Sequence, residues 1–294
     1  MSSLQSVKRA VKPVAGSIRR NVPDALVPAL MRTRLKRAYK NPKRWELARQ
    51  QMTWLLGAVS TEEEIEAAAR RYIERDVMRS ELRYHPKLIT HMPVDGVEHL
   101  AEARARGKGV VLSFLHHGHY EGFCASVARA EQPLVMLVSP EMLAKDRPEF
   151  LKQHVITGTI SGNTVLDASL GMKAILPMFE QGEVVGIATD VAGRTSVQFL
   201  GQERLGSFGA ALIAQKTGAP VVCATAHPDD EHYQRVKLSE PLDPADYASP
   251  EDLLKDMLAH QEVAVLAWPE AYHQPTLRWG VLPKDEPAKD VTPS

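Results

Sequence analysis

The chain of 294 residues carries 36 basic and 36 acidic side chains, and its 44% apolar and 24% charged residues are typical of a globular protein. No apolar run approaches the roughly 20 residues that cross a bilayer, and the amino-terminal segment lacks the apolar stretch of a secretory signal. Two cysteines, Cys124 and Cys223, exclude a disulfide framework and predict buried thiols in a reducing cytosol.

The zero net charge conceals a strong asymmetry along the chain. Residues 1–44 hold twelve basic side chains and one acidic side chain, a net charge of +11, so the remainder carries −11. A basic segment of this kind indicates contact with an anionic surface, either nucleic acid or anionic lipid. The chain contains no nucleic-acid reader motif, so we expect no nucleic-acid partner.

The first 93 residues predict a helical, basic region that is a candidate for membrane contact. Helices are expected over 21–40, with a kink at Pro28, and over 45–56 and 61–78. Thr61 followed by Glu64 is a capping-box pattern, which supports the start of the third helix. We expect residues 94–283 to form a second region, an α/β domain, and residues 284–294 to be a disordered tail.

From residue 94 onward, helices alternate with short apolar strands. The strands are expected over 110–115, 134–138, 184–188 and 221–226, and the helices over 97–106, 120–130, 171–181, 207–217 and 250–266. This alternation predicts an α/β fold with a central, mostly parallel sheet flanked by helices. In such sheets the active groups lie beyond the carboxyl ends of the strands.

A histidine cluster occupies one of these strand ends. His116, His117 and His119 follow the strand at 110–115, and Glu121 opens the next helix. In one interpretation, His116 is a general base, and Glu121 folds back across the turn to orient its imidazole. Gly118 would then let the backbone turn tightly between them. In the other interpretation, His117, His119 and Glu121 are the ligands of a metal-dependent hydrolase.

The first interpretation is supported by a resemblance to a known family. The segment 97–121 (VEHLAEARARGKGVVLSFLHHGHYE), with its His116-x4-Glu121 motif, resembles the late acyltransferases of lipid A biosynthesis and their actinobacterial relatives, which acylate phosphatidylinositol mannosides. These enzymes belong to the lysophospholipid acyltransferase-like superfamily. Further similar blocks cover residues 176–190, 199–201, 209–222, 268–272 and 278–279, so the resemblance spans roughly residues 94–280.

The resemblance implies an acyltransferase that moves a fatty acyl group from acyl-CoA or acyl-carrier protein to a hydroxyl of a glycolipid or related lipid. His116 and Glu121 would be its catalytic dyad, with no metal, no other cofactor and no covalent acyl-enzyme. A non-catalytic lipid-binding relative is the remaining alternative. The chain departs from the family pattern at Asp190-Val191, where Asp-Gln is usual, and lacks an amino-terminal spanning helix.

Three further residues are candidates for substrate binding. Asp190 and Arg194 follow the strand at 184–188, where they would shape the acceptor or thioester site or form a local ion pair in solvent. Arg278 would bind a phosphate of donor or acceptor, since guanidinium matches phosphate geometry, or it would anchor the carboxyl-terminal segment.

With a lipid substrate implied, anionic lipid becomes the expected partner of the basic segment, and we expect a peripheral protein on the cytoplasmic face of the membrane. An apolar face of the helix at 21–40 would enter the interface, and this face holds Ala25, Leu26, Leu30, Met31 and Leu35. The basic side chains would contact headgroups, namely Arg32, Arg34, Lys36, Arg37 and Lys40. The alternative is a helical appendage packed on the core.

Overall fold

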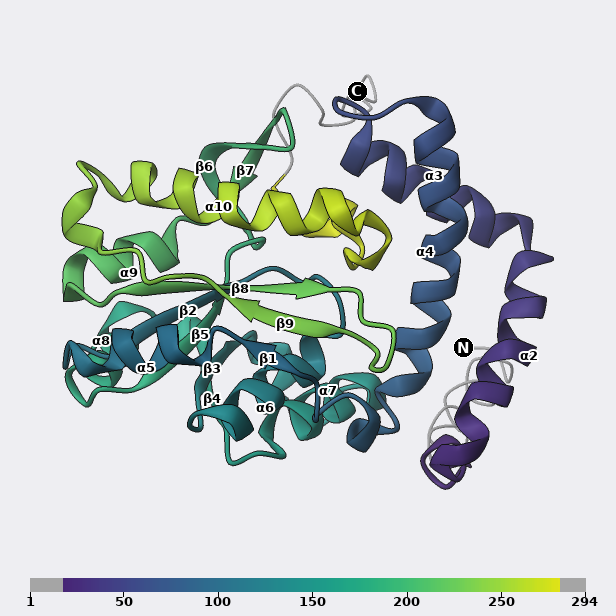
Figure 1. Ribbon diagram of the computed structural model, residues 1–294, viewed down its shortest axis with the longest axis horizontal. Coiled ribbons are helices and arrows are strands. Elements are labelled where there is room, and N and C mark those ends of the chain that lie inside the picture. Colours follow the sequence, from purple (N-terminus) through teal and green to yellow (C-terminus); the bar gives the residue numbers. More distant parts are fainter. Residues whose placement is uncertain (1–17, 281–294) are drawn as a thin grey trace, which may run out of the picture.

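The computed structural model describes residues 18–280 of the chain. Its centre is a seven-stranded sheet in the order β1-β9-β8-β2-β5-β3-β4, in which β2, β3, β4, β5 and β8 run parallel (Figure 1). The strands are β1 (Val94–Asp95), β2 (Val110–Phe114), β3 (Val135–Val138), β4 (Thr164–Asp167), β5 (Val184–Ala188), β8 (Val221–His227) and β9 (Arg235–Leu238). The predicted α/β fold with a mostly parallel sheet is therefore confirmed.

Helices cover both faces of the sheet, because the central strands are apolar on both sides. One face packs against α5 (Val97–Ala105) and α6 (Tyr120–Ala130), and the other against α8 (Met172–Glu180), α9 (Gly209–Thr217) and α10 (Pro250–Ala267) (Figure 1). The predicted helices at 97–106, 120–130, 171–181, 207–217 and 250–266 agree with these to within two residues at each end.

Three amino-terminal helices, α2 (Val27–Tyr39), α3 (Pro42–Leu56) and α4 (Glu62–Leu82), stand beside the carboxyl end of β8 (Figure 1). The predicted capping box is present at the start of α4, where Thr61 and Glu64 bond reciprocally. Pro28 lies in the first turn of α2 and does not kink it, because a proline there removes no helical hydrogen bond. Side chains of α3 and α4 share one hydrophobic cluster with the sheet.

The apolar side chains predicted to enter a membrane interface fall into two groups. Met31 and Leu35 of α2 face the protein, whereas Ala25 and Leu26, before the helix, are exposed. Met31 packs on a cluster formed by Val27, Leu82 and Ile89, and Leu35 packs on the main core. Helix burial of this kind is the usual outcome for an amphipathic helix that has a core beside it.

Of the five basic residues predicted to contact a membrane, one is paired within the protein and four are exposed. Arg34 forms an ion pair with the buried Glu81, which Arg19 also contacts at 2.9 Å. Arg34 therefore stabilises the packing of α2 on α4. The other four side chains are exposed, namely Arg32, Lys36, Arg37 and Lys40. Among the described residues, no helix is both long and apolar enough to span a membrane.

Several elements were not predicted from the sequence. They are α7 (Glu149–Thr159), the edge strands β1, β4 and β9, and an antiparallel hairpin of β6 (Ala192–Phe199) and β7 (Gln202–Gly206). The hairpin lies outside the main sheet, and its alternating exposure matches that of a strand with one solvated face. The predicted tail at 284–294 lies outside the described residues.

The sheet opens between β3 and β5. These strands pair only at Val135↔Val185 and Met136↔Gly186, although β3 continues to Val138 and β5 to Ala188. Their last residues therefore diverge at the carboxyl edge, which leaves space for a cavity at the place where the functional groups are expected.

Candidate active site

His116 lies two residues beyond the end of β2, and Asp190 lies two residues beyond β5. The strands are adjacent and parallel with Phe114 opposite Ala188, so the two side chains reach the same level of the sheet edge. Asp190 accepts a hydrogen bond from the backbone nitrogen of His116 at 2.9 Å, and its other oxygen lies 2.7 Å from Nδ1 of the imidazole. The carboxylate thus fixes both the backbone and the ring.

This arrangement corrects the predicted pairing of His116 with Glu121. In the described part of the chain no hydrogen bond joins these two residues, and Glu121 instead accepts from Nη2 of Arg83 at 3.3 Å. Burial alone would raise the pKa of Glu121, but the charges of Arg83, His154 and Arg79 outweigh burial and lower it. Glu121 is therefore a buried carboxylate held in its charged form.

The contact with Asp190 leaves His116 suited to general base chemistry. A carboxylate at Nδ1 favours the tautomer with its proton on that nitrogen, so Nε2 keeps a lone pair. The His116 side chain is 13% exposed and lines a cavity of about 520 Å³. A base that is fixed on one side and open to a cavity on the other fits the geometry required for proton abstraction.

The cavity is mostly apolar and extends into the opening between β3 and β5. Val138 belongs to the core on one face of the sheet and Leu137 packs on the other, yet both line this cavity. Ile175 of α8 and Ile213 of α9 form an aliphatic wall on the second face. A concave apolar site with a few polar groups at one end is the usual form of a site for a small molecule or a lipid chain.

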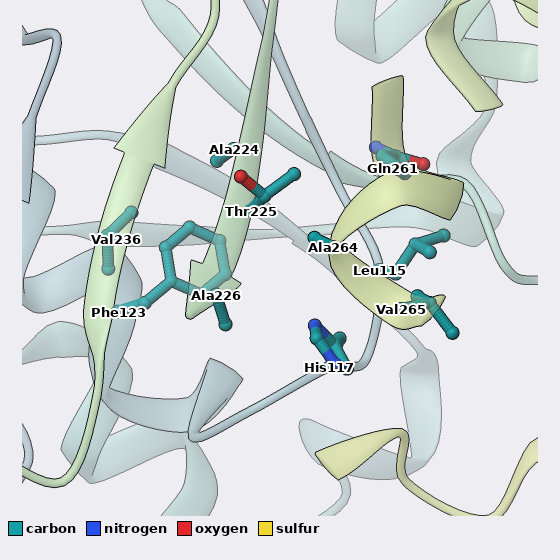
Figure 2. A pocket seen from close by; sticks show the side chains of 10 residues that line it. All are labelled: Leu115, His117, Phe123, Ala224, Thr225, Ala226, Val236, Gln261, Ala264 and Val265. Carbon is teal, nitrogen blue, oxygen red and sulfur yellow. The ribbon is translucent and has the colours of Figure 1, made fainter. Parts of the chain in front are cut away.

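His117 and His119 are buried and point away from this cavity. His117 lines a void of about 10 Å³, the size of one water, between β8 and α10. Figure 2 shows its side chain together with the other residues that line this void. Nε2 of His117 lies 2.9 Å from the carbonyl oxygen of Trp268. Burial lowers the pKa of His117 to about 4 and that of His119 to about 3, so both stay neutral at physiological pH.

The metal-dependent alternative has no support in this geometry. Between residues 18 and 280, no group of three or more histidine, cysteine, aspartate or glutamate side chains is arranged to hold a metal ion. His117 is committed to the Trp268 carbonyl, and Glu121 is committed to Arg83. Two of the three proposed ligands therefore serve separate structural contacts, and the ring of His119 packs against that of Tyr233.

The turn between His116 and α6 is fixed by buried groups that the sequence analysis did not identify. Gly118 has φ +67°, and a Cβ there would lie 2.2 Å from Oε1 of Gln234. That same oxygen accepts from the backbone nitrogen of His119. Arg79 of α4, only 3% exposed, donates to the carbonyl oxygens of Ala271 at 2.8 Å and Gly118 at 3.4 Å. In the sequence, Gln234 and Arg79 are visible only as polar residues with no partner nearby in the chain.

A segment near residue 273 forms the opposite wall of the site. The backbone nitrogen of His273 donates to the carbonyl oxygen of His116 at 2.8 Å. Arg278 donates from Nε to the carbonyl oxygen of His273 and from Nη2 to its Nδ1. Tyr120 completes this group, with its hydroxyl 3.0 Å from the same Nδ1.

The structure separates the three predicted substrate-binding residues. Asp190 and Arg278 line the cavity with His116, whereas Arg194 does not and is exposed on β6. The predicted association of Asp190 with Arg194 is wrong, because Asp190 is committed to His116.

Comparisons with known proteins identify the family of the chain. No curated protein matches the sequence significantly. A solved structure of the 1-acyl-sn-glycerophosphate (LPA) acyltransferase PlsC from Thermotoga maritima is similar at 14% identity and a TM-score of 0.42, over 76% of this chain and 96% of that one. The model of the bacterial lipid A biosynthesis acyltransferase family matches residues 54–279. The chain therefore belongs to the bacterial lipid A biosynthesis acyltransferase family, whose enzymes transfer an acyl group to a lipid acceptor.

Proposed function

We propose that the protein transfers a fatty acyl group from acyl-CoA or acyl-carrier protein to a hydroxyl group of a glycolipid or related lipid. The observation that carries this proposal is the His116–Asp190 pair at the polar end of a large apolar cavity. The pair supplies a base for the hydroxyl, and the cavity supplies an apolar environment for an alkyl chain.

In the proposed reaction, Nε2 of His116 removes the proton of the acceptor hydroxyl while its oxygen attacks the thioester carbonyl. Asp190 stabilises the imidazolium that forms, because it accepts from Nδ1 at 2.7 Å. The tetrahedral intermediate then expels the thiolate by breaking the C–S bond, and the thiolate takes the proton from Nε2. The new ester bond forms without a metal or an acyl-enzyme.

Glu121 has an indirect role in this proposal. It reaches the cavity wall while it neutralises Arg83, which is 16% exposed. Removal of one member of such a buried pair leaves the other charge without a partner, at a cost of about 3–5 kcal/mol. Glu121 is thus a positioning residue that keeps the first turn of α6 and the loop before it in place.

Arg278 is placed to bind an anionic part of a substrate. His273 holds its guanidinium through two contacts, and the side chain lines the same cavity as His116. A guanidinium that is fixed beforehand binds a phosphate at a lower entropic cost than a mobile one. The phosphate would come from the donor or from the lipid.

We also propose that the enzyme is a peripheral protein on the cytoplasmic face of the membrane. The support is electrostatic, because Met31 and Leu35 of α2 are packed inward and four basic side chains of this region remain exposed. Each basic residue near an anionic membrane contributes about 1 kcal/mol. These side chains are Arg32, Lys36, Arg37 and Lys40.

The proposed function is tested with His116→Ala. Purified protein is incubated with radiolabelled palmitoyl-CoA and bacterial lipid extract, and lipids from cells with and without the gene are compared by mass spectrometry. We expect the variant to lose acyl transfer while it keeps its fold, and His260→Ala, on the exposed side of α10, to remain active. Full transfer by His116→Ala would refute the mechanism. A biological role that survives in this variant would favour the non-catalytic lipid-binding alternative.

A further inference from the structure

His154 lines the cavity that contains His116, and the proposed reaction does not use it. It lies in α7, which packs beside α6 (Figure 1). Gly158, one turn further along α7, allows the helix to lie close to the sheet, because a Cβ there would lie 2.7 Å from Cε of Met136 of β3. Val155 and Gly158 line the cavity together with His154, so one side of α7 forms part of its wall.

The ring nitrogens of His154 have no partner within residues 18–280. The ring contacts the ring of Tyr120, at 5.5 Å between centroids, but it forms no hydrogen bond or ion pair with another described residue. The neighbouring imidazoles of His116 and His273 are both held by hydrogen bonds to their rings. Because enclosed polar groups in proteins are usually hydrogen-bonded, a free imidazole on a cavity wall indicates that a ligand supplies the partner.

The charge state of His154 limits what this ligand is. Burial lowers the pKa of His154 to about 4, against the opposing effect of the Glu121 carboxylate, so the ring is neutral at physiological pH. A neutral imidazole has one N–H donor and one lone pair, and it lacks the charge with which a guanidinium binds a phosphate. In an enclosed site such a donor is suited to an oxygen on which negative charge develops during a reaction.

The rings of His116 and His154 pack on the same side chain, that of Tyr120. The centroid distances to Tyr120 are 4.7 Å and 5.5 Å, so the two imidazole centroids lie no more than about 10 Å apart. A base lies about 3 Å from the hydroxyl it deprotonates, that oxygen about 3–3.5 Å from the carbonyl carbon, and the carbonyl oxygen about 3 Å from a donor. Two imidazoles at this separation therefore reach the same reacting group.

Other polar side chains at this end of the cavity are less suited to donate to a carbonyl oxygen. The carboxylate of Asp190 only accepts hydrogen bonds, and it is bonded to His116. The hydroxyl of Tyr120 and the guanidinium of Arg278 both bond to Nδ1 of His273. His154 has no such commitment, and its side chain lines the same cavity.

We propose that His154 is a further catalytic residue, whose N–H donates a hydrogen bond to the carbonyl oxygen of the thioester and stabilises the charge of the tetrahedral intermediate. The inference rests on the proposed acyl transfer and adds the group that stabilises its intermediate. The acceptor oxygen bonds to the carbonyl carbon, its proton goes to Nε2 of His116, and an electron pair of the C=O bond moves to the oxygen that faces His154. His154 keeps its proton, and the oxyanion returns to a carbonyl when the C–S bond breaks.

Two substitutions of His154 separate a donor from a packing residue. His154→Phe removes both ring nitrogens and keeps a ring of similar size against Tyr120. His154→Gln keeps an N–H donor and removes the ring. A donor role and a packing role therefore predict opposite results for these two variants. Ile156→Phe is the matched control, since it places a phenyl ring on the exposed side of the same helix, outside the cavity lining.

The first assay measures release of CoA from palmitoyl-CoA with bacterial lipid extract as acceptor. We expect His154→Phe to lower kcat about 10²- to 10³-fold, the loss caused by removal of one donor to an oxyanion. The KM for palmitoyl-CoA should change by less than about threefold, because the hydrogen bond strengthens only as charge develops on the oxygen. His154→Gln should have a kcat at least about tenfold above that of His154→Phe, and Ile156→Phe should behave as wild type.

A second measurement observes the carbonyl group directly. Infrared difference spectra are recorded with palmitoyl-CoA that is isotope-labelled at its carbonyl carbon, bound to His116→Ala, which blocks transfer. A hydrogen bond from His154 polarises the C=O bond and lowers its stretching frequency. The double variant with His154→Phe should therefore show a higher carbonyl frequency than His116→Ala alone, and the double variant with Ile156→Phe should show the same frequency.

Three results would overturn the inference. They are wild-type kcat in His154→Phe, a His154→Gln variant no more active than His154→Phe, and a carbonyl frequency that is the same with and without the imidazole. Failure of the proposed function looks different, because wild type would then transfer no acyl group to the lipid extract. The infrared comparison decides the inference in that case too, since it requires no acceptor: a higher frequency without His154 supports the contact, and an unchanged frequency refutes it.

Discussion

Asp190→Asn is the substitution that best separates the observed site from the one predicted by the sequence motif. Asp190 is fully buried and receives two donors, the backbone nitrogen of His116 at 2.9 Å and Nδ1 at 2.7 Å. Asparagine has one side-chain oxygen. If this oxygen accepts from the backbone, its amide group faces Nδ1 and selects the tautomer with the proton on Nε2, which is then unable to act as a base.

The expected loss follows from these contacts. General base catalysis contributes about 10²- to 10⁴-fold to a rate, and the wrong tautomer removes most of it. We expect kcat to fall about 10³-fold, which corresponds to roughly 4 kcal/mol of transition-state stabilisation. Thermal stability should change much less, because the two side chains have the same shape and asparagine keeps an acceptor for the backbone nitrogen of His116.

The assay measures release of CoA with a thiol reagent in the presence of acceptor. The protein adds little background, because Cys124 and Cys223 are buried and burial raises the pKa of each thiol to about 12. Turnover of Asp190→Asn within threefold of wild type would refute the role of Asp190 as the partner of His116. An increase in the population of protonated Nδ1, seen by NMR of the His116 ring, would also contradict the reasoning.

Three other substitutions or conditions test separate parts of the structure. Glu121→Gln leaves the partly buried Arg83 without its charge partner, and chemical denaturation should show a loss of about 3 kcal/mol; unchanged stability would contradict the ion-pair role. Three histidines have pKa values lowered by burial, so their contribution to stability is complete above pH 6.5 and is lost as pH falls toward about 4. These histidines are His117, His119 and His154. The free energy of unfolding should fall by up to about 1.4 kcal/mol per pH unit for each of them, and a flat profile between pH 6 and pH 5 would refute this. Glutamine at the four exposed basic positions of α2 and its end should weaken binding to anionic vesicles most strongly at low salt, whereas Lys216→Gln with Lys255→Gln should not; salt-insensitive binding would exclude an electrostatic contact.

The sequence predicted the parallel sheet because its central strands are short, apolar and separated by helices with clear ends. The strand predicted at 184–188 and the helix predicted at 120–130 have the same bounds as β5 and α6. The sequence did not predict the hairpin of β6 and β7, because the residues of these strands alternate only weakly in polarity. One face of the hairpin contacts solvent, so burial does not impose an apolar pattern on that face. The edge strands have two to four residues, too few for periodicity to decide.

The partner of His116 was not predictable from local spacing. Glu121 is five residues away in sequence, but it lies in the first turn of α6 and bonds to Arg83 of the loop after α4. Asp190 was identified as a candidate, but its role depends on β5 being the neighbour of β2. Strand order is a property of the assembled sheet, and the sequence shows only that each strand exists.

The attachment of residues 271–278 has a consequence for how the protein becomes active during its synthesis. This stretch bonds to Arg79 and Gln51 of the amino-terminal helices and to the carbonyl oxygen of His116. The turn that follows His116 is therefore complete only after residues 271–278 have left the ribosome. A nascent chain that already has the His116–Asp190 pair still lacks one wall of the candidate site, so under the proposed function partly made copies do not transfer acyl groups.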